Sequence, residues 1–271
     1  WAEVADFNRR VLEVGLSGGT LSFKDQELTL FRNNAPEQVW MDLNYGPVLG
    51  DDDRPAGVLA IVVETTERVR AEQRQAFLYE LGERQRELAD AAEITFVAAE
   101  MLGRSLGADR VHWAEVQDAA GTFTVDRDWT NGEVPHLLGR HRLEAFGEAL
   151  IAEMRAGSAV AVEDAMADRL TKGVDVGKAF EGSVRGALAV PLVRSGQWRA
   201  ALCVHTRTPR PWREDERELV TEVAERTWAA VQRAEAEARE RASDARFKAL
   251  VNATSEVVFR MSPDWSEMRQ L

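Results

Sequence analysis

Residues 186–206, GALAVPLVRSGQWRAALCVHT, decide how the rest of the chain is interpreted. Two apolar runs flank the short polar segment RSGQ, and this pattern predicts a β-hairpin. In the second run Leu202, Val204 and Thr206 alternate with Cys203 and His205, so the last two project from the same face of a strand. The chain holds one cysteine and four histidines. A thiol and an imidazole this close suit a nucleophile with its base, half of a metal site, a chromophore anchor, or a plain strand.

The hairpin ends a block of mixed structure, residues 108–212. Within it, RVHWAEVQ and TFTVDRDW predict another hairpin around DAAG, and SAVAVED predicts a short strand. EAFGEALIAEMRAG has the periodicity of an amphipathic helix, which Gly157 would end. This order of elements predicts an α+β sandwich with helices on one face of an antiparallel sheet.

Two stretches without proline, residues 64–107 and 213–251, are rich in Ala, Glu, Arg and Leu and predict long helices. Along the second, small and branched residues recur every three or four positions between charged faces. So narrow a stripe predicts a seam with a partner helix, most simply a parallel copy of the chain, whereas the alternative is a solvated single helix. The first predicted helix carries a less regular version of this stripe. The predicted dimer seam comprises Phe77, Leu81, Leu88, Val220, Val223, Val231, Ala234 and Ala238.

The first 65 or so residues are rich in β-strand patterns. ELTLFRN and EQVWMDLNYGPVL are separated by NAP, and the turn DDDRPAG leads into VLAIVVE. Val39, Met41 and Leu43 alternate with polar or larger neighbours, as expected of a strand with one buried face. Three strands make about half of a small sheet domain.

The composition excludes several classes of protein. Of the 271 residues, 45% are hydrophobic and 30% are charged, and the formal charge of −12 lacks the clustered basic footprint that nucleic-acid binding requires. One cysteine cannot form an internal disulfide or a cysteine-based zinc cage, which fits a reducing cytoplasm. We find no apolar run long enough for a membrane span and no signal peptide. Because the sequence begins at Trp1 and ends just after an apolar run has begun, we expect a piece of a longer protein.

The hairpin at 186–206, followed by PRPWREDERELVTEVAERTWAAVQRA, resembles the last hairpin and exit helix of a GAF domain, and this resemblance spans about 80–235. Residues 1–68 resemble the C-terminal half of a PAS domain through VWMDLNYGPVLGDDDRPAGVLAIVVETTERV. Residues 244–271, DARFKALVNATSEVVFRMSPDWSEMRQL, resemble the opening of another PAS domain, with a first strand at Glu256 to Met261. This order is typical of cytoplasmic bacterial sensor histidine kinases and related cyclic-di-nucleotide enzymes.

The resemblance implies an α+β fold. A GAF-type antiparallel sheet with helices would be preceded by the C-terminal half of a PAS sheet and flanked by long signalling helices. The implied domains are part of a PAS domain at 1–68, a linker helix at 69–107 running into the GAF domain, and a GAF core at 108–212. An exit or coiled-coil helix at 213–250 and the start of a second PAS domain at 251–271 complete the series.

GAF domains hold small molecules between the sheet and the loops that cover it. Here the covering segments would be residues 128–143 and 163–186, whose aromatic and polar side chains could converge on a pocket. The favoured alternative is that they are ordinary loop residues with local hydrogen bonds. The candidate ligand-binding residues are Trp129, His136, Arg140, Asp164 and Arg185. We expect no evident cofactor, with an unknown small ligand as the open alternative. The Asn-Lys signature of cyclic-nucleotide-binding GAF domains is absent, and one cysteine cannot supply the three of GAF-type methionine sulfoxide reductases.

Other chemistry finds little support in the sequence. GLSGGT at 15–20 lacks the lysine of a phosphate loop, and no GxSxG or HExxH signature occurs, so we expect no catalytic residues here. Bilin-binding GAF domains carry a cysteine directly followed by histidine in a loop or helix, together with an Asp-Ile-Pro segment, whereas here Val204 separates the pair. Cys203 and the histidines, His112, His136, His141 and His205, show no recurring metal-ligand spacing, although His112 and His205 could share the central sheet.

We therefore expect a non-catalytic sensory and relay region of a sensor histidine kinase or related protein, acting as a parallel homodimer in the cytoplasm. A cue in a PAS or GAF pocket would shift the helices at about 64–105 and 213–250 and bias an output domain beyond Leu271. The alternative is a GAF receptor domain whose main function is to bind a small ligand or chromophore. A third possibility is a structural GAF domain that binds nothing. No nucleic acid or membrane is an expected partner.

Overall fold

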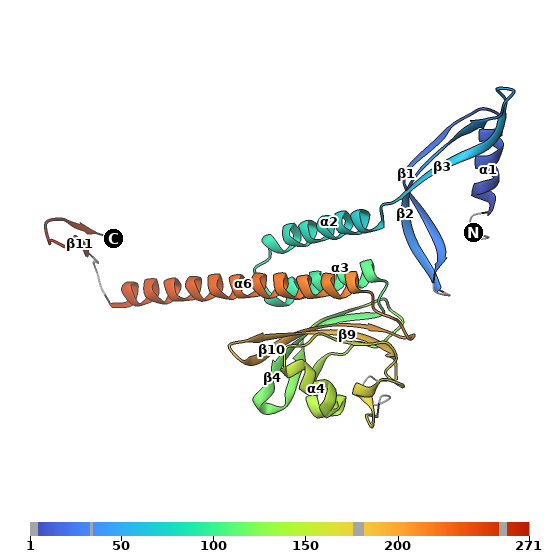
Figure 1. Ribbon diagram of the computed structural model, residues 1–271. Coiled ribbons are helices and arrows are strands. Elements are labelled where there is room, and N and C mark those ends of the chain that lie inside the picture. Colours follow the sequence, from blue (N-terminus) through green and yellow to red (C-terminus); the bar gives the residue numbers. More distant parts are fainter. Residues whose placement is uncertain (1–4, 33–34, 176–181, 255–258, 271) are drawn as a thin grey trace. The chain divides into compact units, whose positions relative to one another are not determined.

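The computed structural model describes residues 5–32, 35–175, 182–254 and 259–270. The chain divides into two compact units, residues 1–77 and 78–271 (Figure 1). Helix α2 (Thr66–Arg86) contains the division. None of the helices within the described ranges is both long and apolar enough to cross a membrane.

The first unit is a three-stranded antiparallel sheet with one helix. Strands β1 (Leu21–Arg32), β2 (Ala35–Leu49) and β3 (Pro55–Glu64) follow one another in space as in sequence, and α1 (Ala5–Leu16) packs on them. Val39, Met41 and Leu43 of β2 are buried, as their alternation predicts. The three predicted strands are confirmed, whereas α1 was not predicted.

The stretch predicted as one linker helix is two helices. Residues 87–90 separate α2 from α3 (Ala91–Leu106), so the continuous helix expected over 69–107 was wrong. The physical reason is a helix start at Asp90, whose carboxylate accepts a hydrogen bond of 3.0 Å from the Glu93 N–H. Gly107, with a φ of 58°, ends α3 in the left-handed conformation that glycine adopts readily.

The second unit is built on an antiparallel sheet in the order β7-β5-β4-β10-β9-β8, with β6 also paired to β4. The predicted hairpin of residues 186–206 is confirmed as β9 and β10, joined by Ser195 and Gly196, both at positive φ as a tight hairpin turn requires. TFTVDRDW, predicted as one strand, is divided between β5 and β6. The strands are β4 (Arg110–Gln117), β5 (Thr122–Val125), β6 (Asp128–Thr130), β7 (Gly139–Arg142), β8 (Val160–Val162), β9 (Gly186–Arg194) and β10 (Gln197–Thr206).

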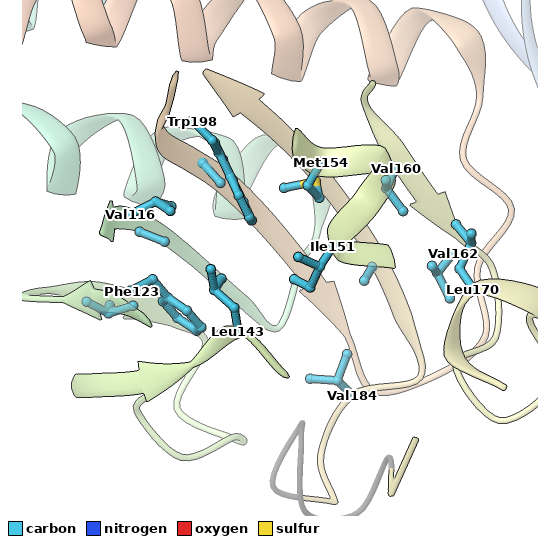
Figure 2. Packing of buried hydrophobic residues seen from close by; sticks show 14 of the residues in the cluster. Val116, Phe123, Leu143, Ile151, Met154, Val160, Val162, Leu170, Val184 and Trp198 are labelled. Atoms are coloured by element: carbon cyan, nitrogen blue, oxygen red, sulfur yellow. The ribbon is translucent and has the colours of Figure 1, made fainter. Parts of the chain in front are cut away.

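Helices cover both faces of this sheet, not one face as the sequence predicted. Helices α3 and α6 (Glu214–Thr254) lie on one face, and α4 (Glu148–Arg155) packs on β8, β9 and β10 from the other (Figure 1). Around α4, Ile151 and Met154 belong to a cluster of buried residues that includes Phe123, Val160 and Trp198 (Figure 2). Short 3₁₀ turns occupy Asp118–Ala120, Leu143–Phe146 and Arg169–Thr171.

The C-terminal end of the chain forms a small hairpin of β11 (Phe259–Met261) and β12 (Met268–Gln270). The strand predicted at Glu256 to Met261 is described only from Phe259 onward, because residues 255–258 lie outside the described ranges.

Much of the predicted dimer seam is buried inside a single chain. Val220, Val223, Val231 and Ala234 of α6 have exposed fractions between 0 and 5%, and Leu81 of α2 is fully buried. Leu88 packs, partly buried, beside Ile94 of α3. The stripe faces the chain's own sheet and helices in this part of α6, so these residues are not available for the seam predicted with a second copy of the chain. Phe77 is half-buried and Ala238 is exposed, so the part of the seam that a second copy could reach is short.

Candidate ligand-binding cavity

A cavity of about 70 Å³ lies between the α4 face of the sheet and the elements that cover it. Its walls are almost entirely apolar and come from five strands, α4 and the segment around Leu143–Phe146. The lining residues are His112, Ala114, Val116, Phe123, Leu137, Leu143, Phe146, Leu150, Ile151, Met154, Val160, Val162, Ala187, Ala189, Trp198, Ala201, Cys203 and His205.

The cavity exists because small residues occupy the sheet beneath α4. Ala187 and Ala189 of β9 and Ala201 of β10 line it, whereas the residues between them, such as Leu188 and Leu202, are fully buried and do not line it. Successive side chains of a strand point to opposite faces, so the larger residues pack toward α3 and α6. A register shift between Trp198 and Ala200 reverses the alternation and brings the Trp198 indole to the cavity side as well.

Three polar side chains gather on the central strands at this cavity. Cys203 of β10 lies opposite His112 of β4 in the strand register, and His205 follows on the same face of β10. The rings of His112 and His205 meet edge to face, with centroids 5.0 Å apart. The sequence therefore placed Cys203 and His205 correctly on one face, and His112 joins them from the neighbouring strand.

Arg110 fixes the proton of His205. The Arg110 side chain is fully buried, and its Nε and Nη2 atoms each lie 3.3 Å from Nδ1 of His205, while Nη1 donates to the Pro135 carbonyl at 3.0 Å. A guanidinium can only donate, so Nδ1 of His205 is the acceptor and the neutral ring carries its proton on Nε2.

All three polar groups at the cavity are uncharged near neutral pH. Burial, with smaller contributions from Arg110 and His141, lowers the pKa of His112 to about 3. Burial and then Arg110 and His112 also lower the pKa of His205 well below its ordinary value. Burial raises the pKa of the Cys203 thiol to about 12, against a smaller opposing effect of Arg110. The cavity wall is thus electrically neutral, although a buried cation lies behind His205.

Nδ1 of His112 is buried and has no hydrogen-bond partner among the described residues. The residue is 2% exposed and lines the cavity. Leaving a buried polar atom unpaired costs about 1–3 kcal/mol, so such an atom calls for an explanation.

None of the five ligand-binding residues predicted from the sequence lines the cavity, although all five are described. Trp129 of β6 instead packs on α3, where a Cβ added to Gly103 would lie 2.0 Å from its ring. The His136 side chain is 60% exposed and bonds through Nδ1 to the buried Asp128 carboxylate at 2.5 Å. Arg140 is exposed on β7 and donates to the Thr122 hydroxyl.

The remaining two predicted residues form a local ion pair. The Arg185 guanidinium donates to both carboxylate oxygens of Asp164, at 2.8 and 2.6 Å. These bonds, with one from the Met166 N–H, lower the pKa of Asp164 to about 2. The pair joins the two ends of the covering segment at 163–186 and does not reach the cavity. His136, Arg140, Asp164 and Arg185 thus bond to neighbouring protein groups, and Trp129 packs on α3.

The described residues contain no cluster of three or more His, Cys, Asp or Glu side chains suited to a metal ion. A covalent chromophore also finds no reactive thiol here, because a cysteine attacks as its thiolate and Cys203 keeps its proton at neutral pH.

The cavity residues that sequence reasoning missed carried a readable signal. Small residues alternate with large ones in ALAV at 187–190, and ALCV at 201–204 repeats the alternation. Together with His112 on the adjacent strand, this alternation indicates a face of the sheet on which small side chains leave unfilled space.

A family model of the GAF domain matches residues 90–231, which is more than half of the chain. The chain therefore belongs to the GAF domain family. No curated protein matches the sequence.

Solved structures agree on the fold. A bacteriophytochrome from the photosynthetic bacterium R. palustris is similar with a TM-score of 0.58 and 15% identity, over 85% of this chain and 49% of its own. The GAF domain of a phosphoenolpyruvate-protein phosphotransferase from Coxiella burnetii has a TM-score of 0.50 and 17% identity, over 62% and 98%. A far-red-absorbing protein with bound biliverdin has a TM-score of 0.50 and 18% identity, over 59% and 99%. This chain thus spans about half of the bacteriophytochrome, and identities this low show the fold alone.

Proposed function

We propose that this chain is the non-catalytic sensory and relay region of a signal-transduction protein, in which a small molecule in the cavity biases the packing of α3 and α6. The supporting observation is that the same strands separate the cavity from the helices. In β10, Ala201 and Cys203 line the cavity, while Leu202 and Val204 are fully buried on the side that α3 and α6 cover. A change in the position of β10 on filling of the cavity would therefore reach α6 directly.

A second route leads from the covering segment to α3. Leu137 lines the cavity, and its backbone N–H donates to the buried Asp128 carboxylate at 2.7 Å. Trp129, which follows Asp128 in the sequence, packs directly against Gly103 of α3. Movement of this segment about a ligand would press on α3.

Buried polar contacts hold α2 in one register against α6. The Gln85 amide donates to the Ile94 carbonyl and to the Thr227 hydroxyl, both at 3.2 Å, and Gln85 and Thr227 are at most 3% exposed. Arg233 donates to the Gln85 carbonyl at 2.9 Å. A register change of α6 would break these bonds together, which suits a two-state relay.

The proposal extends to the parent protein. The PAS-like segments at 1–68 and 251–271, in this order around a GAF domain, support a cytoplasmic bacterial sensor histidine kinase or a related signalling protein. The exposed end of the α6 stripe, from Ala238 onward, supports a parallel homodimer joined beyond the globular part. The output domain would lie in the same polypeptide, after α6.

The second candidate is a receptor domain for a chromophore, which the fold of the bacteriophytochrome favours. Two observations on this chain weigh against it. The cavity of about 70 Å³ is small beside the roughly 300–1,000 Å³ of pockets for drug-sized ligands. The thiol of Cys203 is also protonated and lies in a strand.

A cross-linking experiment tests the relay. In a chain carrying Cys203→Ala, the additional change Ala238→Cys should give a disulfide-linked dimer, and Glu240→Cys, on another face of α6, should cross-link far more slowly. Filling the cavity with Ala201→Leu should alter the rate at Ala238→Cys, whereas Ala152→Leu on the exposed side of α4 should not. A strictly monomeric chain at tens of micromolar would refute the dimer. An unchanged rate after Ala201→Leu would refute the relay.

A further inference from the structure

The residues that line the cavity indicate the chemistry of its ligand, an inference that rests on the proposed sensory function. We infer that the ligand is a small uncharged aromatic molecule, about one substituted ring in size, with one hydroxyl or N–H group that bonds to Nδ1 of His112.

The apolar character follows from the walls. Apart from His112, Cys203 and His205, every lining residue is aliphatic, aromatic or methionine. Phe123, Phe146, Trp198 and the Met154 thioether surround the space, and aromatic rings and sulfur both favour contact with an aromatic ring.

The size follows from the volume. About 70 Å³ is several times the roughly 10–15 Å³ that a cavity needs to hold one water, and it lies well below the range of drug-sized pockets. A single ring suits such a space better than a nucleotide or a tetrapyrrole does.

The lack of charge follows from the polar end. His112 and His205 stay neutral because they are buried near Arg110, and Cys203 stays protonated. Arg110 is not among the lining residues, and its guanidinium is engaged with His205 and Pro135. An anionic ligand would lose its hydration without meeting a cation, so a neutral molecule is favoured.

The single hydrogen bond follows from the unpaired atom. Nδ1 of His112 is buried without a partner among the described residues, and the ring is held edge to face against His205. A hydroxyl can donate to this nitrogen or accept from it, so it satisfies the atom in either tautomer of His112. A purely apolar ligand would leave the atom unsatisfied.

The test compares phenol, toluene and benzoate on the whole chain labelled with ¹³C at the methionine methyl groups. Met154 lines the cavity, whereas Met41 belongs to the other unit and serves as an internal reference. Phenol should shift the Met154 signal and leave Met41 unmoved, with an affinity about fivefold above that of toluene, as one net hydrogen bond allows. Benzoate should not bind.

Two variants test which residues cause the preference for phenol over toluene. His112→Phe should lower the affinity for phenol to that for toluene, while Ala201→Leu should abolish both and the matched Ala152→Leu should change neither. If His112→Phe does not fold, the order of the three probes on the unaltered chain decides the question alone. Equal binding of phenol and toluene, or preferred binding of benzoate, would overturn the ligand class but leave the cavity as a sensory site. If no probe moves Met154, both the ligand class and the role of the cavity in the proposed function fail.

Discussion

The two faces of strand β10 differ although they belong to one run of ten residues. On the side of α3 and α6, Leu202 and Val204 are completely buried by close packing. On the side of α4, Ala201, Cys203 and His205 border a cavity. One strand therefore combines a core surface, which fixes the fold, with a surface whose gaps leave room for a ligand.

The difference shows how a sheet can be stable and still respond to a ligand. Filled packing resists displacement because protein interiors are as dense as organic crystals. The cavity face lacks those contacts, so its residues can change their neighbours at lower cost. The same kind of substitution should therefore change the free energy of unfolding by different amounts on the two faces.

The largest effect is expected from truncating the packed face. Leu202→Ala should lower the free energy of unfolding by about 2–5 kcal/mol, because it removes a fully buried side chain and leaves a hole between β10 and the helices. Cys203→Ala, one residue away but beside an existing cavity, should cost about 1 kcal/mol or less. Urea unfolding followed by circular dichroism gives both values. Equal losses would show that the two faces are packed alike.

Acidification should weaken the chain through the cavity face. The unfolded chain protonates its histidines near pH 6.5, whereas native His112 stays neutral down to about pH 3 and His205 also has a lowered pKa. Below pH 6.5 the unfolded state thus binds more protons, and stability falls as the pH falls. Between pH 6.5 and 5 the loss from His112 alone should be about 1.5 kcal/mol, and His205 adds to it in the same direction.

The window from pH 6.5 to 5 lies above the range where the Asp164–Arg185 pair is lost, because the pKa of Asp164 is lowered to about 2 from an ordinary value near 4. His112→Phe removes one of the two histidines and should make the slope of stability against pH clearly shallower. Stability that stays flat across this window would contradict neutral burial of these residues.

The sequence predicted the sheet of the second unit better than the site. The apolar runs of 186–206 and the turn between them specify β9 and β10, and the periodicity of 213–251 specifies α6. The break before α3 was missed because its signal is one residue, Asp90, within a run of strong helix formers. The side on which α6 buries its stripe depends on the sheet beneath it, and periodicity alone does not reveal that neighbour.

The ligand-binding residues predicted from the sequence do not line this cavity, for a related reason. The predicted residues are mostly polar side chains of the covering segments, but Asp164 and Arg185 bond to each other and His136 bonds to Asp128. A cavity is made by the residues that are too small to fill it, so its sequence signal is alanine on alternate strand positions. Its one unpaired polar group, His112, became informative only when the register placed it opposite Cys203.

Adding volume should have opposite effects on the two sides. Ala224→Leu introduces a large side chain at a fully buried position of α6 and should cost about 1–3 kcal/mol. Ala201→Leu enters the cavity and should raise the free energy of unfolding by about 0.5–2 kcal/mol. Thermal unfolding with matched urea titrations compares the two variants. A loss of stability in Ala201→Leu as large as that in Ala224→Leu would mean that the cavity does not accept added atoms.

The thiol of Cys203 should contribute least to stability, but its reactivity should differ strongly between the native and the unfolded chain. With a pKa of about 12, the native thiol at pH 8 holds a far smaller thiolate fraction than an unfolded cysteine with a pKa near 8.5. Alkylation by iodoacetamide, followed by mass spectrometry, should be at least roughly a thousandfold slower in the native chain than in guanidinium chloride. If the native thiol reacts within tenfold of the unfolded one, Cys203 is accessible as a thiolate, and the chromophore-anchoring alternative regains its strongest argument. Slow reaction leaves Cys203 as part of the neutral cavity wall, where its role is to leave space beside His112.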